Sequence, residues 1–241
     1  MDKERAGKYP PIPNVHLPVM LQKWCHLTFL HWRLPVSAVR SFIPKPLTVD
    51  SFDGSAWVGV TPFLLRDLRP PIGPAVPWLS EFPETNCRTY VRGPDEQPGI
   101  WFFSLEAARA MAVFGARVTY GLPYAWARMR VETGRRMRYR SVRLWPDQKT
   151  ATSIEVEPAE PIEAGEREIF LTARYRLYSS IAGRIVYAEV EHPPWPLQAA
   201  RVIHVEETLT RAAGLPRPPD MPLAHYSPGV ATRIGRPKIV P

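Results

Sequence analysis

Polar side chains able to recognise a ligand or exchange a proton with it gather in one short stretch of the sequence. In E-F-P-E-T-N-C-R-T-Y-V, Glu81 and Glu84 flank a proline, and Asn86, Arg88 and Tyr90 follow at alternate positions. Alternate positions of a strand face the same side of a sheet, so an acid, an amide, a guanidinium and a phenol point one way. The pattern is typical either of a buried polar network or of a site where arginine clamps a carboxylate or carbonyl ligand.

A second group of candidate ligands lies on the first predicted strand, where Cys25, His26 and His31 occur. His26 and His31 are an odd number of positions apart and therefore face opposite sides. Cys25 and His31 share a face but lie ~20 Å apart at about 3.3 Å per residue, so we predict no metal site. The sequence also lacks a phosphate-binding loop, a dinucleotide glycine pattern and a nucleophile-elbow serine, and we expect no cofactor.

Arginines follow one face of a predicted hairpin at 125–144. Apolar side chains occupy the opposite face, which is typical of a half-buried strand pair with a basic outer surface. A module for single-stranded nucleic acid would interleave stacking aromatics with the basic residues, but the aromatic here falls on the other side. We therefore favour a solvated sheet edge over nucleic-acid binding. The arginines are Arg128 and Arg130 on the first strand and Arg136, Arg138 and Arg140 on the second.

The elements that position these side chains are predicted to be many short strands and a few helices. Aromatic and β-branched runs indicate strands, whereas caps, alanine content and terminal glycines indicate helices. The proline-rich segment 69–77 is predicted to be a loop. Because no βαβ rhythm occurs, we predict a mainly β (α+β) fold, an antiparallel β-barrel with a few added helices. Predicted strands cover 23–34, 55–63, 86–92, 125–144, 168–178 and 183–192, and predicted helices begin at Ser37 and cover 104–115 and 205–214.

Length and composition predict a single domain at 1–241, with an extended N-terminal arm at 1–20 and a proline-rich, mostly irregular tail at 215–241. The 241 residues are 45% apolar and 11% aromatic, enough to fill a substantial core. No secretory signal, no membrane-spanning run of ~18 apolar residues and no disulfide framework is evident. We therefore expect a cytoplasmic protein without a membrane partner. The net charge of +8 favours anionic partners, and a homo-oligomer stays open.

Six longer motifs, which recur in order from about Trp24 to Val230, resemble one bacterial family. They are F-P-E-T-N-C-R-T-Y-V, G-I-W-F-F-S-L-E-A, A-R-V-T-Y-G-L-P-Y-A-W-A, L-T-A-R-Y-R-L-Y, V-E-H-P-P-W-P-L-Q-A-A and H-Y-S-P-G-V. The chain resembles the YqjF-like family of unknown function (DUF2071), which is similar to a distant branch of the acetoacetate decarboxylase-like superfamily. The resemblance implies a closed β-barrel of that type around a central cavity. Residues 36–50 are similar to the decarboxylases' short helix and following Pro-x-Pro-Leu-x-x-Asp.

The resemblance also implies a change at the reactive position. Decarboxylases of this fold carry a Pro-Lys-Lys turn whose first lysine forms a Schiff base with the keto acid. The matching turn here is G-L-P-Y-A, which puts Tyr124 at the lysine position, and a phenol cannot form an imine. Glu84 matches the decarboxylases' glutamate, two positions after an aromatic, whereas no arginine stands near Cys25, where a pocket arginine is expected. All six lysines lie in tails, turns or polar surroundings, so we predict no Schiff-base decarboxylation.

The expected cavity contains Glu84 and Tyr124, with Asn86 and Arg88 on the same strand face as Glu84. His192 ends a predicted strand before P-P-W-P-L and either faces this cavity or only caps the strand. The first hypothesis is a protein that binds a small organic-acid or carbonyl ligand in the cavity. The second is an enzyme without a Schiff base, in which Glu84 and Tyr124 perform acid–base chemistry on a keto or hydroxy acid. The third is a basic surface that contacts nucleic acid through the hairpin arginines.

Overall fold

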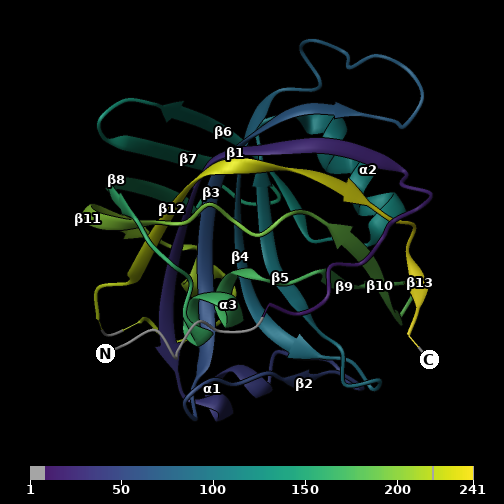
Figure 1. Cartoon of the computed structure of the whole chain (residues 1–241), viewed down its shortest axis with the longest axis horizontal. Coiled ribbons are helices and arrows are strands. Elements are labelled where there is room, and N and C mark those ends of the chain that lie inside the picture. Colours follow the sequence, from purple (N-terminus) through teal and green to yellow (C-terminus); the bar gives the residue numbers. More distant parts are fainter. Residues whose placement is uncertain (1–8, 219, 241) are drawn as a thin grey trace.

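The computed structural model describes residues 9–218 and 220–240, whose strands join into one 13-stranded sheet (Figure 1). The strand order is β13-β10-β9-β5-β6-β7-β8-β11-β12-β1-β3-β4-β2. The strands are β1 (Met20–Leu34), β2 (Thr48–Val49), β3 (Ala56–Arg69), β4 (Phe82–Arg92), β5 (Pro98–Ala107), β6 (Tyr124–Glu132), β7 (Met137–Trp145), β8 (Ala151–Pro161), β9 (Arg176–Ile181), β10 (Arg184–Glu191), β11 (Gln198–Glu207), β12 (Leu223–Ile234) and β13 (Lys238–Ile239). The helices are α1 (Val36–Arg40), α2 (Ala110–Tyr120), α3 (Glu166–Thr172) and α4 (Leu209–Ala212).

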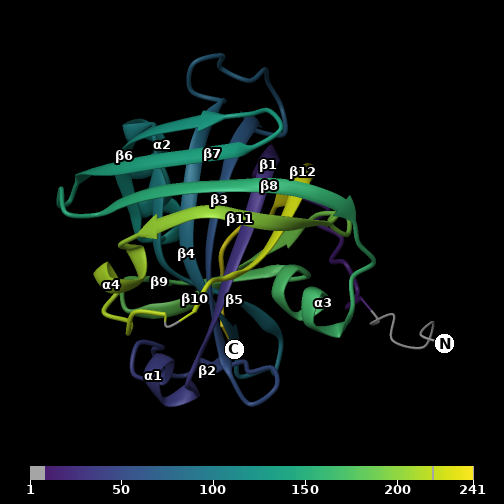
Figure 2. The same cartoon turned by 90° about the vertical axis from the view of Figure 1, so that its left-hand side faces the viewer.

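The sheet curls back on itself through two further pairings, β4 with β5 and β10 with β12. Most neighbours are antiparallel, but β5 pairs in parallel with both β6 and β9. Figures 1 and 2 show the strands wrapped around the molecule's centre, with α1 and β2 at one end and the loop before β4 projecting from the other. The mainly β (α+β) architecture with a few helices is confirmed. A regular closed antiparallel barrel stays a prediction, because only two residue pairs join β11 to β12.

β4 separates two different interiors, because successive side chains of a strand point to opposite faces. On one face, Cys87 and Val91 are fully buried and pack with Tyr139 of β7 and Ile154 of β8 in the main apolar core. The other face carries the polar row predicted from the sequence and borders a cavity. β4 is hydrogen-bonded to β3 on one side and to β5 on the other. The fold therefore holds the polar row on a rigid central strand.

Most predicted elements lie where the sequence pattern places them. The predicted strands at 23–34, 55–63, 86–92 and 183–192 correspond to β1, β3, β4 and β10, and the hairpin at 125–144 corresponds to β6 and β7. The short helix predicted from Ser37 is α1, and residues 70–77 form neither helix nor strand. Asp53 and Gly54 have φ values of 50° and 70°, as a tight turn with positive φ at both central positions requires.

The helix predicted at 104–115 is wrong in its bounds, since α2 begins six residues later at Ala110 and ends at Tyr120. Residues 104–107 instead extend β5. Ser104 and Leu105 pair with β4, and Leu105 also pairs in parallel with Tyr124 of β6. Sheet pairing on both sides outweighs the helix propensity of this alanine-rich stretch, because tertiary context overrides weak local preference.

The strand predicted at 168–178 is also wrong in its first half, where the chain forms α3. Gly165 is the N-cap of this helix. The side chain of Glu168 accepts a hydrogen bond of 3.2 Å from the Gly165 backbone N–H. This is one half of a capping box, and Glu166 and Glu168 lie in the first turn, where acids are favourable. The β-branched and aromatic residues of E-I-F-L-T pointed to a strand, but the cap decides the local structure. The strand begins only at Arg176.

The tail at 215–241 is not mostly irregular, because it contains β12, which lies between β1 and β11. Pro228 and Gly229 lie within this strand, and because both residue types are unusual inside strands, the sequence pattern did not indicate it. Gly229 has a φ of 131°, and a Cβ there would lie 2.1 Å from the backbone oxygen of Trp24, so only glycine fits against β1. In the predicted helix at 205–214, only Leu209–Ala212 is helical, followed by Gly214 at a φ of 81°.

At the N-terminus, residues 9–19 form neither helix nor strand, whereas Met20, the last residue of the predicted arm, begins β1. The rest of the predicted arm, residues 1–8, lies outside the described residues. The single-domain organisation of 1–241 stays a prediction. Among the described residues, none of the helices has the length and apolar character needed to cross a membrane.

Candidate functional site

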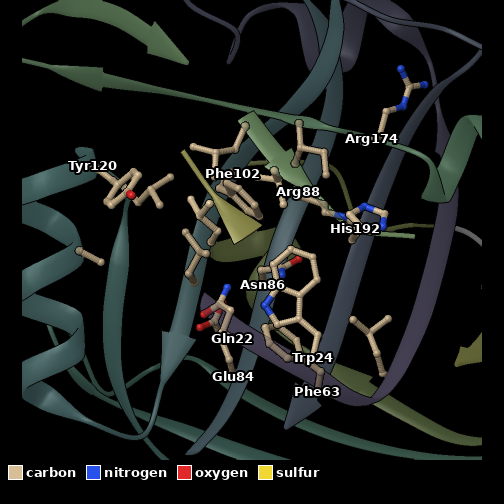
Figure 3. A pocket seen from close by; sticks show the side chains of 18 of the residues that line it. Gln22, Trp24, Phe63, Glu84, Asn86, Arg88, Phe102, Tyr120, Arg174 and His192 are labelled. Carbon is tan, nitrogen blue, oxygen red and sulfur yellow. The ribbon is translucent and has the colours of Figure 1, made fainter. Parts of the chain in front are cut away.

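The five residues predicted to form a site all line one cavity of about 100 Å³. Glu84, Asn86 and Arg88 come from β4, Tyr124 begins β6, and His192 follows β10. In Figure 3, Asn86 lies between Glu84 on one side and Arg88 with His192 on the other. Residues up to 108 positions apart in the sequence thus meet around a single cavity.

Tyr124 reaches the cavity because the chain bends sharply after α2. Gly121 ends the helix in the left-handed conformation with a φ of 60°, and a Cβ there would lie 2.2 Å from the backbone oxygen of Ser180. Glycine is therefore required by both the conformation and the space. The chain then enters β6, where Tyr124 is paired with Leu105 of β5. Its hydroxyl donates a 3.1 Å hydrogen bond to Oε2 of Glu84.

Glu84 is a buried carboxyl group with 4% of its surface exposed. Burial raises the pKa of Glu84 to about 8, and the hydrogen bond from Tyr124 opposes this rise only in part. The group is therefore mostly protonated at neutral pH, because desolvation penalises the charged form. Burial and the neighbouring Glu84 raise the pKa of Tyr124 well above its usual range. The two side chains thus form a neutral pair in which protons can be held or passed to a ligand.

Arg88 is a buried guanidinium group with 7% of its surface exposed. Its guanidinium carbon lies 5.4 Å from the ring centroid of Phe29 and 6.0 Å from that of Tyr90, so aromatic faces stabilise the charge in part. Its Nε has no hydrogen-bond partner. Within residues 9–218 and 220–240, no ion pair joins Arg88 to a carboxylate. A buried charge without a counter-charge is unfavourable, which makes Arg88 a candidate anion-binding group.

The other two arginines that line the cavity are already paired. Arg174 forms a 2.7 Å ion pair with Asp50, and Arg176 forms a 2.6 Å ion pair with Asp95. Each therefore has a carboxylate partner, although Asp50 also contacts the more exposed Arg92 at 2.9 Å, and this partner distinguishes both from Arg88. The sequence prediction missed both residues, although their alternation in L-T-A-R-Y-R-L-Y would place them on one face of a strand.

Asn86 carries the second unpaired polar atom of the row. Its side-chain Oδ1 is buried and lacks a hydrogen-bond partner within the described part of the chain. Asn86 pairs across the sheet with Leu105, and Arg88 pairs with Phe102. Because cross-strand pairs share a face, each of these polar groups lies beside an apolar side chain. The amide is thus placed to bond to a ligand that Arg88 holds.

His192 both lines the cavity and has a partner of its own. Only 3% of its surface is exposed, and Nδ1 lies 2.7 Å from the backbone oxygen of Pro193. Because a carbonyl accepts, Nδ1 carries the proton in this bond. Burial lowers the pKa of His192, so the ring is neutral at physiological pH. The ring packs on Tyr175 and Trp195, whose ring centroids are 4.8 Å and 5.2 Å away. His192 therefore both lines the cavity and bonds to the backbone just after β10, as the two interpretations of its role require.

Two members of the predicted polar stretch do not belong to the site. Glu81 is exposed and forms a 3.2 Å ion pair with Arg66. The Tyr90 hydroxyl donates to the backbone oxygen of Leu171 at 2.7 Å and accepts from Nε2 of His31 at 2.6 Å. Tyr90 is therefore part of a buried hydrogen-bond network, the first of the two interpretations of the polar stretch.

The sequence prediction missed most of the apolar wall. β1 contributes Met20, Gln22 and Trp24 at alternate positions, near the place where the resemblance led us to expect an arginine. Trp24 stacks on Trp195 with centroids 5.9 Å apart and an 8° angle between the rings. Alternation along M-L-Q-K-W could have placed the three β1 residues on one face, but nothing local indicates which face borders the cavity.

No described lysine can replace the missing amine. Lys23, Lys45, Lys149 and Lys238 are all exposed, and none lines the cavity. Lys3 and Lys8 lie outside the described residues.

Two of the three candidate metal ligands, His26 and His31, contact different side chains. Nδ1 of His26 lies 2.9 Å from the Tyr226 hydroxyl, whereas Nε2 of His31 lies 2.6 Å from the Tyr90 hydroxyl. The histidines therefore have separate partners.

The hairpin arginines face outward as predicted, and acidic residues pair with several of them. Arg138 contacts Glu155 at 3.1 Å, and Arg135 contacts Glu157 at 2.8 Å. Arg136 also pairs with Glu155, at 3.1 Å. These ion pairs offset much of the positive charge that a nucleic acid would need, so the geometry favours the solvated edge.

Solved structures with the same fold include an acetoacetate decarboxylase and an enzyme complexed with pyruvate. The chain superposes on acetoacetate decarboxylase from Legionella pneumophila with a TM-score of 0.69 and 11% identity, covering 100% of this chain and 94% of that one. It superposes on the enduracididine biosynthesis enzyme MppR complexed with pyruvate with a TM-score of 0.65 and 12% identity, covering 93% and 91%. At these identities the likeness establishes an acetoacetate decarboxylase-like fold.

Sequence comparison identifies nearer relatives. The uncharacterized protein YqjF of Bacillus subtilis (strain 168) is 37% identical over 222 residues, which cover 89% of this chain and 91% of YqjF. The profile of DUF2071, described as an uncharacterized conserved protein (COG2071), matches residues 21–231. Together with the fold and the cavity, this match shows that the chain belongs to the DUF2071 family.

Proposed function

We propose that this protein binds a small organic acid in the cavity and that Arg88 holds the ligand's carboxylate. The observation that carries the proposal is the buried guanidinium of Arg88, which borders the cavity and has no carboxylate partner in the described chain. An incoming carboxylate would supply the missing counter-charge. Its two oxygens match the planar fork of a guanidinium.

Neighbouring groups extend the proposed site beyond the carboxylate. The Asn86 amide lies two positions along β4 and has an unpaired Oδ1, which can accept from a ligand hydroxyl. Farther along, the protonated Glu84 can donate to a carbonyl or hydroxyl oxygen. MppR, which shares the fold, is described as complexed with pyruvate, and this supports a small acid as the ligand class.

The mode of binding is non-covalent. Tyr124 stands where the resemblance places the Schiff-base lysine, and its hydroxyl is bonded to Glu84. A phenol has no amine with which to condense with a ketone, and the four described lysines are exposed. Borohydride treatment in the presence of pyruvate is therefore expected to leave the chain's mass unchanged.

Titration calorimetry with pyruvate and butyrate tests the role of Arg88. Arg88→Met removes the charge at nearly constant volume and is expected to weaken both acids by about 10- to 100-fold, the usual effect of losing hydrogen bonds to a charged group. Arg140→Met is the matched control, because it removes one exposed positive charge from the hairpin. Equal affinity of Arg88→Met and wild type, or no binding of either acid to wild type, would contradict the proposal.

A second candidate function is proton transfer, favoured by the 3.1 Å contact between Tyr124 and Glu84. Ionised Glu84 can take a proton from the carbon next to a ligand's carbonyl group and return one from solvent. NMR in D₂O would detect this as deuterium entering the methyl group of pyruvate. Because the pKa of Glu84 is about 8, the exchange rate should increase as the pH approaches that value. Exchange unaffected by Glu84→Gln rules this activity out.

A further inference from the structure

We propose that the cavity selects a monocarboxylic acid with an apolar body of about six carbon atoms, over di-acids and amino acids of the same length. This inference rests on the proposed function, because it takes the ligand's carboxylate to be bound at Arg88. It goes further by assigning the chemistry of the rest of the ligand, which the carboxylate alone does not determine.

The wall around the polar row is mostly apolar. Phe102 and Leu105 of β5 lie directly across from Arg88 and Asn86, and Trp24 and Phe63 lie near Glu84 in Figure 3. Leu122 and Val190 also line the cavity. A hydrocarbon body would therefore lose contact with water against these side chains, and burial of apolar surface is favourable. A short acid such as pyruvate or a small hydroxy acid can reach Asn86 beside Arg88 but would leave most of this apolar wall without a contact.

The charges around the cavity leave room for a single negative charge. Asp50 and Asp95 already pair with Arg174 and Arg176, and Arg92, which also contacts Asp50, is 41% exposed and does not line the cavity. Arg88 is therefore the one cavity-lining arginine without a carboxylate partner in the described chain. At the other end of the row, Glu84 is itself an acid. A second ligand carboxylate would be desolvated there without a cation to balance it, which is strongly unfavourable.

A ligand ammonium group is disfavoured for a related reason. It would need an anionic acceptor at the end of the cavity distant from Arg88, which requires the buried Glu84 to ionise. The resulting buried ion pair would have to offset the desolvation of both charges, a cost that often exceeds the Coulombic gain. Tyr124 already donates to Oε2 of Glu84. A neutral, apolar chain end avoids both problems, since it requires no partner.

Strand geometry and volume set the length of the ligand. Glu84 and Arg88 are four positions apart on β4, which corresponds to about 13 Å along an ideal strand. Part of that span is filled by the two side chains themselves. The cavity volume of about 100 Å³ is of the same order as an engineered apolar cavity of about 150 Å³ that takes up benzene. An acid of about six carbons therefore fits.

Four probes matched in structure test the inference by titration calorimetry on the full chain at neutral pH. Butyrate and hexanoate differ only in two methylene groups, and hexanoate, adipate and 6-aminohexanoate share a six-carbon chain with different ends. We expect hexanoate to bind about tenfold more tightly than butyrate, since each buried methylene contributes about a three- to fourfold gain. Adipate and 6-aminohexanoate should bind at least about tenfold more weakly than hexanoate.

Two variants separate this inference from the proposed function. Phe102→Ser, with Phe102→Leu as a milder version in case the first fails to fold, should reduce the preference for hexanoate over butyrate. Arg88→Met should weaken both acids equally. Binding that depends on Arg88 but not on chain length, or that favours adipate or 6-aminohexanoate, overturns the inference and leaves the proposed function standing. Failure of all four acids to bind, or binding independent of Arg88, overturns both.

Discussion

Two buried arginines in this molecule have opposite surroundings. Arg143 on β7 donates to both oxygens of Glu106, at 3.0 Å and 2.6 Å, and to Asp147 at 2.8 Å. Arg88 on β4 is equally buried but has no carboxylate partner in the described chain and an unpaired Nε, and its guanidinium lies over the ring of Phe29. The Arg143 cluster meets the general requirement that buried charges be compensated. The exception at Arg88 occurs at the cavity, and this difference is the basis of the binding role that we propose for it.

The largest expected effect follows from breaking the compensated region. Glu106→Gln removes the bidentate partner of Arg143 and leaves a buried charge with only the half-exposed Asp147. We expect the free energy of unfolding to fall by about 3–5 kcal/mol, measured by urea denaturation followed by tryptophan fluorescence.

Arg88→Met provides the matched comparison for that measurement. It removes a charge that has no partner to lose, so stability should change by less than about 1 kcal/mol or rise. A loss at Arg88 as large as that at Glu106 would show that both arginines are structural and would remove the contrast.

A pH-dependent effect of about the same size as that of Glu106→Gln is expected at Glu84. Its folded pKa of about 8 exceeds the value of about 4.3 for an unfolded glutamate, so the folded state keeps a proton that the unfolded state releases. The resulting stabilisation is complete below about pH 4 and is lost as the pH rises through about 8. Between pH 5 and pH 9, wild type should therefore lose about 4 kcal/mol relative to Glu84→Gln.

Urea denaturation at a series of pH values checks this prediction, with Glu81→Gln as a control for an exposed glutamate three positions away. Parallel pH profiles for wild type and Glu84→Gln would mean that the Glu84 carboxyl is ionised in the folded protein. The cavity would then contain its own counter-charge for Arg88, and the contrast with Arg143 would weaken.

The smallest effect is expected at the exposed hairpin. Arg138 contacts Glu155 at 3.1 Å, but solvent screens the pair and the two long side chains lose entropy in forming it. Arg138→Gln should therefore leave the thermal unfolding midpoint unchanged within error. A clear decrease would show that the hairpin ion pairs act as a network and contribute to the fold.

Local patterns account for the predictions that succeeded. The alternation of Glu84, Asn86 and Arg88 has the period of a strand, and this period alone places the three on one face. The hairpin at 125–144 is likewise determined by its alternation and turn. By contrast, residues 104–107 and 168–172 have mixed local preferences. Pairing with β4 and β6 makes the first a strand, and the cap at Gly165 makes the second a helix.

The sequence by itself determined the chemical groups and their order: a polar row on one strand face, a tyrosine after a glycine bend, and a histidine at a strand end. Only the tertiary structure decided that these groups surround one cavity, because Tyr124 meets Glu84 across 40 positions of the chain. It also decided which arginines are neutralised, since Asp50 reaches Arg174 across 124 positions. Side-chain period is a local property of the backbone, whereas burial and charge compensation depend on which distant segments the fold brings together.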